Sequence, residues 1–232
     1  YMWDMFFGES YEPPAWENAR KKGKLSRELL KASRNYPDKV RLYNFWLQIQ
    51  RLEKDEVQGD FAELGVYKGD SARVIHRMAP GRTLHLFDTF EGFTGTDLKP
   101  ETGVASTYTT NNFADTSLNK VLKNIGGDSG KIRLHPGYFP ETATGLENST
   151  FALVNMDADL YNPTKAGLEF FYPRLSPGGV ILVHDYNYKW EGLMKAVDEF
   201  VLTLPETPVL SPDLDSTIMI IKNKGRVQNN FK

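Results

Sequence analysis

The sequence has no cysteine among its 232 residues, so it can form neither disulfide bonds nor thiolate metal sites. It also has no apolar run close to the roughly 20 residues that a membrane-spanning helix needs. Its 28 Lys and Arg residues nearly balance its 30 Asp and Glu residues, and neither sign forms a long block. Such a pattern lacks the basic stripe of proteins that bind a nucleic acid backbone. We therefore expect neither a membrane nor a nucleic acid as a partner.

The start of the chain does not resemble a secretory signal. It carries Asp4, Glu9 and Glu12 where such a signal needs a basic start and an apolar middle. We therefore expect a cytoplasmic protein. The length suits one well-buried α/β domain. We assign this domain to residues 58–232, after an N-terminal helical extension, or lid, over residues 1–57.

Short apolar segments alternate with stretches of helical periodicity, which is typical of a mostly parallel sheet with crossover helices. Before them, apolar residues at helical spacing predict a helix over about Asp38–Lys54, with Asp38 as its cap. The expected strands are Phe61–Leu64, Thr83–Phe87, Ile132–His135, Phe151–Met156, Val180–Val183 and Thr217–Ile221.

The boundaries of two later helices can also be predicted. Asn162 stands directly before a proline and is expected to cap a helix over about Pro163–Arg174. The four residues Ser176–Gly179 are then expected to form a turn before the next strand. Another helix is expected over about Trp190–Leu204, where a proline follows.

The longest stretch without hydrophobic periodicity is Phe93–Asn112, which is rich in Gly, Thr and Asn. Loops of this length are usually functional, and we predict a mobile cover that becomes ordered over the occupied site. Aromatic residues near the N-terminus are candidates for stacking on an acceptor, and packing or a subunit contact is an equal alternative. These aromatic residues are Trp3, Phe6, Phe7, Tyr11 and Trp16.

A glycine turn follows the first expected strand. Glu63 ends that strand, Gly65 and Gly69 follow, and Ser71 lies in the first turn of a helix. Glycine lets the backbone approach a ligand closely, and a helix N-terminus offers free N–H groups. Glu63 occupies the first glycine position of the dinucleotide fingerprint, and its carboxylate suits a cationic ligand such as the amino group of S-adenosylmethionine. The alternative is an ordinary tight turn.

Asp88 ends the second expected strand. Folds of this kind place there the carboxylate that binds ribose hydroxyls. The alternative is an Asp that caps a helix or a turn. We expect Asp88 and the glycine turn to act together on one cofactor.

More acids follow two later strands. Asp157 and Asp159 come after the fourth strand, and His184 and Asp185 come after the fifth. The carboxyl ends of parallel strands meet at one edge of the sheet, so these groups should be neighbours. Together they form a plausible site for a divalent cation such as Mg²⁺. The alternative is that the acids contact a cofactor or cap a helix. His184 would then be an imidazole at a strand end whose hydrogen bonds are satisfied and that binds no metal.

Five motifs follow one another in the chain, at Gly59–Gly69, Phe87–Phe93, Asp157–Thr164, Tyr172–Gly179 and Ala196–Phe200. Together they resemble the macrocin O-methyltransferase family of class I S-adenosylmethionine-dependent enzymes. The match extends to about Lys222, whereas roughly the first 50 residues match loosely.

The resemblance implies a Rossmann-like class I methyltransferase sheet of seven strands with the last one antiparallel. It also implies Mg²⁺ at the strand-end acids and, as acceptor, a hydroxyl of a small molecule such as a sugar or a natural-product glycoside. One departure is His184, which stands where characterised members have an Asp before Asp185. Imidazole suits transition metals better than it suits Mg²⁺.

Methyl transfer requires an aligned acceptor oxygen and a group that takes its proton. We predict Asp157, Asp185 and His184 as metal ligands, with His184 alternatively a base. Asp159 is the first choice for the general base, and it could exchange roles with Asp157. Predicted cofactor-binding residues are Glu63, Gly65, Tyr67, Gly69, Ser71, Asp88, Thr89, Gly137, Tyr138, Phe139 and Asp157.

Within that set, Tyr138 and Phe139 follow the third strand and border the adenine side or belong to the core. We also expect a homo-oligomer.

Two other classes of protein remain open. A nicotinamide oxidoreductase would use a similar glycine turn and Asp88, although Glu63 argues against it. A non-catalytic ligand-binding homologue is the other alternative, with His184 as its only hint.

Overall fold

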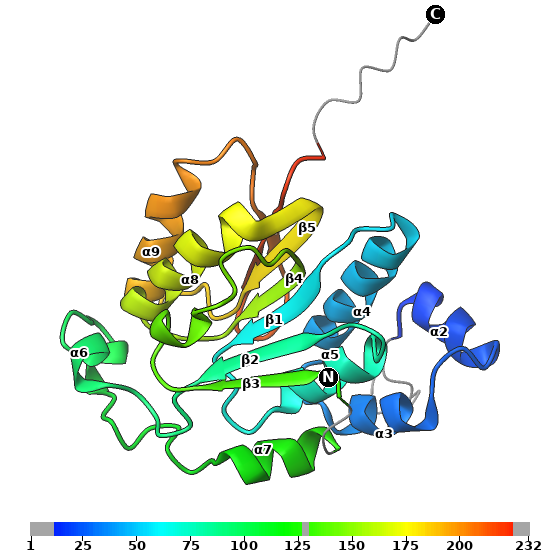
Figure 1. Ribbon diagram of the computed structural model, residues 1–232, viewed down its shortest axis with the longest axis horizontal. Helices are drawn as coiled ribbons and strands as arrows, with labels where there is room; N and C mark the ends of the chain where they lie inside the picture. The colour runs from blue at the N-terminus through cyan, green and yellow to red at the C-terminus, as the bar shows by residue number, and fades with distance from the viewer. Residues whose placement is uncertain (1–11, 127–129, 225–232) are drawn as a thin grey trace, which may run out of the picture.

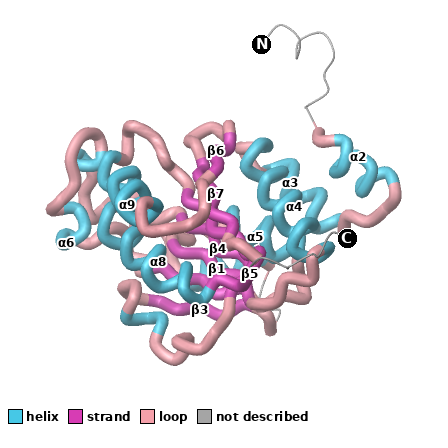
Figure 2. The backbone as a smooth tube through the Cα atoms, turned by 90° about the horizontal axis from the view of Figure 1, so that it is seen from above, coloured by secondary structure: helices cyan, strands magenta, loops and turns pink. Residues whose placement is uncertain are grey.

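The computed structural model describes residues 12–126 and 130–224. In this part of the chain, seven strands form one sheet in the order β3-β2-β1-β4-β5-β7-β6, between two layers of helices (Figures 1 and 2). All six expected strands are present, whereas β6 was not expected. The strands are β1 (Asp60–Leu64), β2 (Leu84–Asp88), β3 (Ile132–Pro136), β4 (Phe151–Met156), β5 (Leu175–Val183), β6 (Val209–Ser211) and β7 (Thr217–Ile221).

The pairing of the strands determines where a ligand can bind. Strands β3, β2, β1, β4 and β5 are parallel, and β7 runs antiparallel to both of its neighbours. This confirms the predicted α/β class and the antiparallel last strand. The strand order reverses between β1 and β4. Open α/β sheets bind ligands in the crevice at such a switch point.

Helices cover both faces of the sheet, and Figure 2 shows the two layers on opposite sides of it. Buried apolar side chains form one cluster under each layer. Among the helices of the described ranges, none is long and apolar enough to cross a membrane. One layer holds α2 (Pro14–Lys21), α3 (Arg27–Asn35), α4 (Lys39–Lys54), α5 (Asp70–Met78) and α7 (Leu118–Ile125), and the other holds α8 (Tyr161–Arg174) and α9 (Glu191–Val201).

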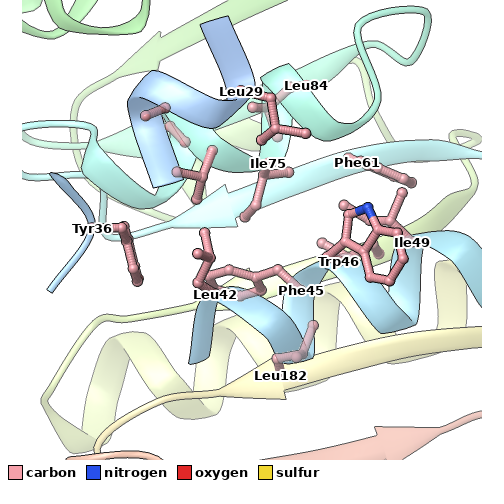
Figure 3. Close-up of a cluster of buried hydrophobic side chains, with 14 of the residues drawn as sticks. Leu29, Tyr36, Leu42, Phe45, Trp46, Ile49, Phe61, Ile75, Leu84 and Leu182 are labelled. Carbon is pink, nitrogen blue, oxygen red and sulfur yellow. The ribbon is translucent and has the colours of Figure 1, made fainter. Parts of the chain in front are cut away.

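Helix α4 forms where the apolar periodicity predicts it. The Asp38 carboxylate accepts a hydrogen bond from the Arg41 amide at 2.9 Å and so caps the first turn. The apolar face of α4, with Leu42 and Phe45, is buried in one cluster with the strand residue Leu182 (Figure 3). The helical extension is therefore packed into the same core as the sheet. The domain boundary at residue 58 stays a prediction.

Trp16 resolves one of the open alternatives. Its side chain is buried and packs edge-on against Tyr43 and Trp46, with ring centroids 5.4 and 5.3 Å apart. Trp16 is therefore a core residue and does not stack on a ligand. The other predicted aromatic residues, Trp3, Phe6, Phe7 and Tyr11, lie outside the described residues.

The predicted turn at Ser176–Gly179 is wrong. These residues belong to β5, because the main chain of Gly178 and Gly179 exchanges hydrogen bonds of 2.8 and 2.9 Å with Lys222. Gly178 has φ +83° and the β4–β5 register shifts here, so the four residues form an irregular part of β5. The antiparallel neighbour stabilises it, which the local sequence does not reveal. Helix α9 is also shorter than expected, since it ends at Val201.

Helix α8 begins earlier than predicted, at Tyr161, so Asn162 lies inside the helix and does not cap it. The Glu101 carboxylate instead accepts a hydrogen bond from the Tyr161 amide at 2.7 Å. Glu101 belongs to the long segment Phe93–Asn112, which contains the short helices α6 (Gly95–Leu98) and η1 (Ala105–Thr107). Closure of this segment over an occupied site stays a prediction.

Two imidazoles meet between β2 and β3. His85 Nδ1 lies 2.9 Å from His135 Nε2, and His85 Nε2 lies 3.3 Å from Asp60 Oδ2. Burial lowers the pKa of both rings, and the adjacent His85 helps to lower the pKa of His135 to about 4. An unfolded imidazole has a pKa of about 6.5. The neutral rings therefore stabilise the fold fully above that pH, and this stabilisation is lost as the pH falls toward 4.

We expect His135→Gln to reduce the loss of stability between neutral and acidic pH. The difference from wild type should be about 1–2 kcal/mol, because one pKa unit is worth about 1.4 kcal/mol and the ring is only half-buried. Urea unfolding at about pH 7.5 and about pH 4.5 measures it. Arg133→Lys, on the same strand, keeps every imidazole and should behave like wild type. If His135→Gln lost as much stability at acidic pH as the wild type, the lowered pKa of His135 would not be the cause of that loss.

Candidate active site

One cavity of about 370 Å³ opens at the carboxyl ends of β1, β2, β4 and β5, at the switch point of the sheet. Most of the predicted site residues line this cavity. Glu63 and Gly69 are not among the lining residues. Those that line it are Gly65, Tyr67, Ser71, Asp88, Thr89, Gly137, Tyr138, Phe139, Asp157, Asp159, His184 and Asp185.

Backbone hydrogen bonds continue past the strand ends and join the segments that carry the site. Each of these segments donates one N–H to the neighbouring strand, with N···O distances of 2.8–2.9 Å. The donors are the amides of His184, Asp157, Gly65 and Gly137. The floor of the cavity is therefore a continuous extension of the sheet.

The glycine turn after β1 is shaped by close packing. Gly65 has φ +84°, and a Cβ atom there would clash with the carbonyl oxygen of Asp157. Gly69 is the N-cap of α5 and makes no side-chain cap hydrogen bond. The first N–H groups of α5 are thus available to an anionic ligand group. Ser71, in this first turn, lines the cavity.

The Asp88 carboxylate fixes the conformation of this turn. Its Oδ2 atom accepts hydrogen bonds from the amides of Val66 and Tyr67 at 2.7 and 2.8 Å, and its Oδ1 atom accepts one from Phe90 at 2.6 Å. Asp88 therefore links the end of β2 to the loop after β1. Its contact with a ribose stays a prediction.

Glu63 is buried on the α4 side of the sheet, beneath the cavity. Ser71 Oγ and Asn155 Nδ2 donate hydrogen bonds to its Oε1 atom, the latter at 2.8 Å. Burial raises the pKa of Glu63 to about 8, although both hydrogen bonds oppose the shift. Its Oε2 atom has no hydrogen-bond partner among the described residues. Glu63 is therefore a buried carboxyl group that favours its protonated form.

Arg41, from the first turn of α4, extends beneath the same cavity. Its Nη2 atom donates to Asp157 Oδ2 at 3.0 Å and to Asn155 Oδ1 at 3.3 Å. Burial acts to lower the pKa of Arg41, but the Asp157 charge raises it above its usual value. Burial likewise acts to raise the pKa of Asp157, and Arg41 holds it below the usual value. Asp157 is thus kept ionised by a buried cation.

Asp159 and Asp185 form a second carboxyl pair. Burial, followed by the neighbouring Asp185, raises the pKa of Asp159 well above its usual value. Burial and the Asp157 charge raise the pKa of Asp185 to about 6. Each carboxyl group thus contributes to the pKa shift of the other, and the pair favours a protonated state more than an isolated aspartate does. Both residues have φ +62°, and backbone strain of this kind gathers at functional sites.

The predicted metal ligands are brought together. Asp157, His184 and Asp185 each offer one ligand atom, and these atoms lie within 4.8 Å of one another. Because Arg41 occupies Oδ2 of Asp157, the Oδ1 atom is left for a ligand. One imidazole nitrogen and two carboxylates can hold a divalent cation.

The predicted adenine side is bordered by Tyr138 and Phe139, which both line the cavity. The Tyr138 hydroxyl donates a hydrogen bond to Asp97 Oδ1 at 2.7 Å. Phe139 also stacks on Phe171 with ring centroids 5.5 Å apart, so it is a core residue and a lining residue at once.

Sequence reasoning missed several residues of the site. Arg41 and Asn155 carry a signal that could have found them: Asn155 is the one polar residue of β4, and Arg41 lies on the apolar face of α4. Asp97 carries no local signal, since its contact with Tyr138 spans 41 positions. Other lining residues that were missed are Tyr36, Pro37, Trp190 and Asp215.

The sheet order and the acids at its carboxyl edge define a class I, Rossmann-like O-methyltransferase fold. The macrocin-O-methyltransferase (TylF) family matches residues 17–208, and the chain belongs to this family. The predicted fold class and family are therefore confirmed.

Two curated relatives and one solved structure illustrate the similarity. The 8-demethyl-8-(2,3-dimethoxy-alpha-L-rhamnosyl)-tetracenomycin-C 4'-O-methyltransferase of Streptomyces olivaceus is 32% identical over 63% of this chain and 60% of its own length. The mycinamicin III 3''-O-methyltransferase of Micromonospora griseorubida is 33% identical over 63% of this chain and 62% of its own length. This chain thus spans about three fifths of these relatives. The O-methyltransferase NovP superposes with a TM-score of 0.66 at 26% identity, covering 80% of each chain.

Proposed function

We propose that the protein is an S-adenosylmethionine-dependent O-methyltransferase, assisted by a divalent metal, that acts on a hydroxyl of a sugar or a natural-product glycoside. The observation that carries this proposal is the single cavity that joins the glycine turn and Asp88 to the acids after β4 and β5. A methyl donor bound at the glycine turn can meet an acceptor bound at the acids only if both groups of residues border the same cavity.

The turn after β1 suits the cofactor. The uncapped N-terminus of α5 and Ser71 offer donors to a carboxylate. Glu63 lies beneath the cavity and is connected to it through the Ser71 hydroxyl, which donates to its Oε1 atom. Tyr138 and Phe139 offer aromatic faces at the other end of the cavity. When bound, S-adenosylmethionine supplies an electrophilic methyl group. A nicotinamide cofactor is less favoured, because Glu63 stands where a pyrophosphate needs glycine.

Asp159 is the better candidate for the general base. Asp157 is committed to Arg41, whereas Asp159 lines the cavity and forms no ion pair with a described residue. The direction of its pKa shift means that Asp159, once ionised, is the stronger base of the two. Its task is to accept the proton of the acceptor hydroxyl while the cavity aligns that oxygen with the methyl group. The buried walls of the cavity exclude water from this step.

The acid cluster fits a divalent cation, since its three ligand atoms lie within 4.8 Å of one another. Asp157, Asp185 and His184 would hold the ion. A cation in this position lowers the pKa of an acceptor hydroxyl.

The acceptor is proposed to enter beside Tyr36, Pro37, Trp190 and Asp215, which border the cavity from loops outside the glycine turn. An aromatic face with a carboxylate is a common arrangement for binding a sugar ring. The name of the tetracenomycin-C relative includes a rhamnosyl group, and the mycinamicin III relative is also named as an O-methyltransferase, which supports this class.

We also propose a cytoplasmic location and a homo-oligomer. The edge strand β6 leaves Val209 and Leu210 exposed, which favours a subunit contact over a free edge. Light scattering on the purified protein measures the oligomeric state.

We expect Asp88→Asn to weaken the affinity for S-adenosylhomocysteine by at least about tenfold. The substitution removes the charge and replaces one of the two accepting oxygens by an NH₂ group, so the amides of Val66 and Tyr67 or the amide of Phe90 lose their acceptor. Each charge-assisted hydrogen bond is worth about 1.5–3 kcal/mol. Isothermal titration calorimetry measures the affinity, and methyl transfer to glycoside acceptors is followed with labelled cofactor.

The control for this experiment is Glu91→Gln, which changes an exposed carboxylate three positions away. It should bind the cofactor like wild type. Unchanged affinity in a folded Glu63→Ala, Asp88→Ala double variant would exclude both residues as cofactor anchors. A wild-type protein that binds neither S-adenosylmethionine nor S-adenosylhomocysteine would refute the proposed function.

A further inference from the structure

His184 is connected to a buried chain of hydrogen bonds that leads away from the cavity. Its Nδ1 atom lies 3.1 Å from Thr217 Oγ1, on β7. The Thr217 hydroxyl donates to Asp213 Oδ2 at 2.5 Å, and the Thr217 amide donates to Asp213 Oδ1 at 2.6 Å. All three residues are buried. The contacts therefore exclude bulk water as a competing partner.

The direction of these bonds determines where the hydrogen on the ring lies. A threonine hydroxyl has one hydrogen, and here it is donated to the Asp213 carboxylate, which can only accept. The oxygen of Thr217 is then left with lone pairs toward His184. His184 must donate from Nδ1, and in a neutral imidazole the other nitrogen, Nε2, carries the lone pair.

Nε2 is also the nitrogen that remains for the cavity. His184 lines the cavity and lies within 4.8 Å of the ligand atoms of Asp157 and Asp185. A histidine that binds a metal usually donates its second N–H to a carboxylate, a carbonyl or water, which orients the ring. Thr217, whose hydroxyl is held by Asp213, is such a partner for His184. His184 itself stands where the family resemblance predicts an Asp.

We propose that Thr217 and Asp213 are positioning residues that hold His184 as the Nδ1–H tautomer and direct its Nε2 lone pair at the acid cluster. The inference rests on the proposed metal-assisted function and extends it. The site then presents one nitrogen and two carboxylates, a donor set that prefers Mn²⁺ over Mg²⁺.

The tautomer can be observed without any metal. The chain has 4 histidines, so long-range ¹H–¹⁵N correlation spectra of metal-free protein labelled at histidine are simple, and His184→Gln identifies the His184 signals. We expect a protonated Nδ1 and an unprotonated Nε2 in the wild type. The opposite tautomer, or a ring that carries a hydrogen on both nitrogens at about pH 8, would overturn the proposal if found in the folded wild type.

Asp213→Asn is the sharpest variant. Its remaining side-chain oxygen can still accept from the Thr217 amide, so its NH₂ group faces Thr217 Oγ1. The threonine hydrogen is then free to be donated to His184 Nδ1, and the ring changes to the Nε2–H tautomer. Thr217→Ser keeps the hydroxyl and should retain the wild-type tautomer, which controls for a general disturbance of the loop.

Titration of the same proteins with Mn²⁺ and with Mg²⁺ tests the consequence. We expect Asp213→Asn to lose about 10–100-fold in Mn²⁺ affinity, Thr217→Ser to stay within about threefold of wild type, and His184→Asp to shift the preference toward Mg²⁺. Equal Mn²⁺ affinity in wild type and in an Asp213→Asn protein with the inverted tautomer would overturn the proposal. If the wild type binds neither cation but shows the expected tautomers, metal assistance fails while the positioning role is supported.

Discussion

Replacement of Arg41 by methionine is expected to lower the free energy of unfolding by about 2–4 kcal/mol. The guanidinium is the buried partner of Asp157, and removal of one member of a buried ion pair costs about 3–5 kcal/mol, reduced here because Asp157 borders the cavity. Urea unfolding at neutral pH measures the change.

A double-mutant cycle separates the charge pair from simple packing. Asp157→Asn removes the carboxylate, and the Arg41→Met, Asp157→Asn double variant removes both charges. We expect the double variant to be more stable than Arg41→Met alone, because it no longer buries an uncompensated carboxylate. Strictly additive effects in the cycle would show that Arg41 acts through packing alone.

Asp159→Asn is expected to lower kcat by about 10²–10⁴-fold, which is the usual contribution of a positioned general base. The affinity for S-adenosylhomocysteine should change by less than about threefold, because the glycine turn and Asp88 do not depend on Asp159. Single-turnover rates and calorimetry measure the two quantities separately.

Glu169→Gln, which removes an exposed carboxylate from α8, is the control and should keep the wild-type rate. The competing assignment exchanges the roles of the two acids. It would be supported by an Asp157→Asn variant that loses the rate while Asp159→Asn keeps it.

The parts of the fold that were predicted depend on short-range patterns. Helix α4 and strand β4 follow from apolar spacing, and the acids after β4 and β5 could be expected to meet because parallel strands end at one edge. The parts that were not predicted depend on distant partners. The main chain of Lys222 forms hydrogen bonds with Gly178 and Gly179, which therefore belong to β5. The Glu101 carboxylate accepts a hydrogen bond from the Tyr161 amide at the start of α8.

The same distinction applies to the site. Asp88 was expected from its position at a strand end, and its bond with the Phe90 amide, two residues on, agrees with the alternative of an Asp that caps a turn. Its bonds with the amides of Val66 and Tyr67 span more than 20 positions, and no local pattern reveals them. Arg41 was counted with the N-terminal extension, and its charge becomes part of the site only because α4 packs across the sheet beneath Asp157. The apolar spacing of α4 shows that Arg41 lies on the buried face, but its partner Asp157 is 116 positions away and is set by the packing of the layers.

The close packing at Gly65 has a mechanical consequence. Because no atom fits between Gly65 and the Asp157 carbonyl, the glycine turn and the acid segment cannot slide past each other. A ligand that pushes the turn outward has to carry the Asp157 main chain with it and pull against Arg41 below. The distance between the glycine turn and the acid segment is therefore fixed by this close contact. The loops that carry Tyr36 and Asp215 also border the cavity but lie outside this contact, so they can change without moving the glycine turn or the acid segment.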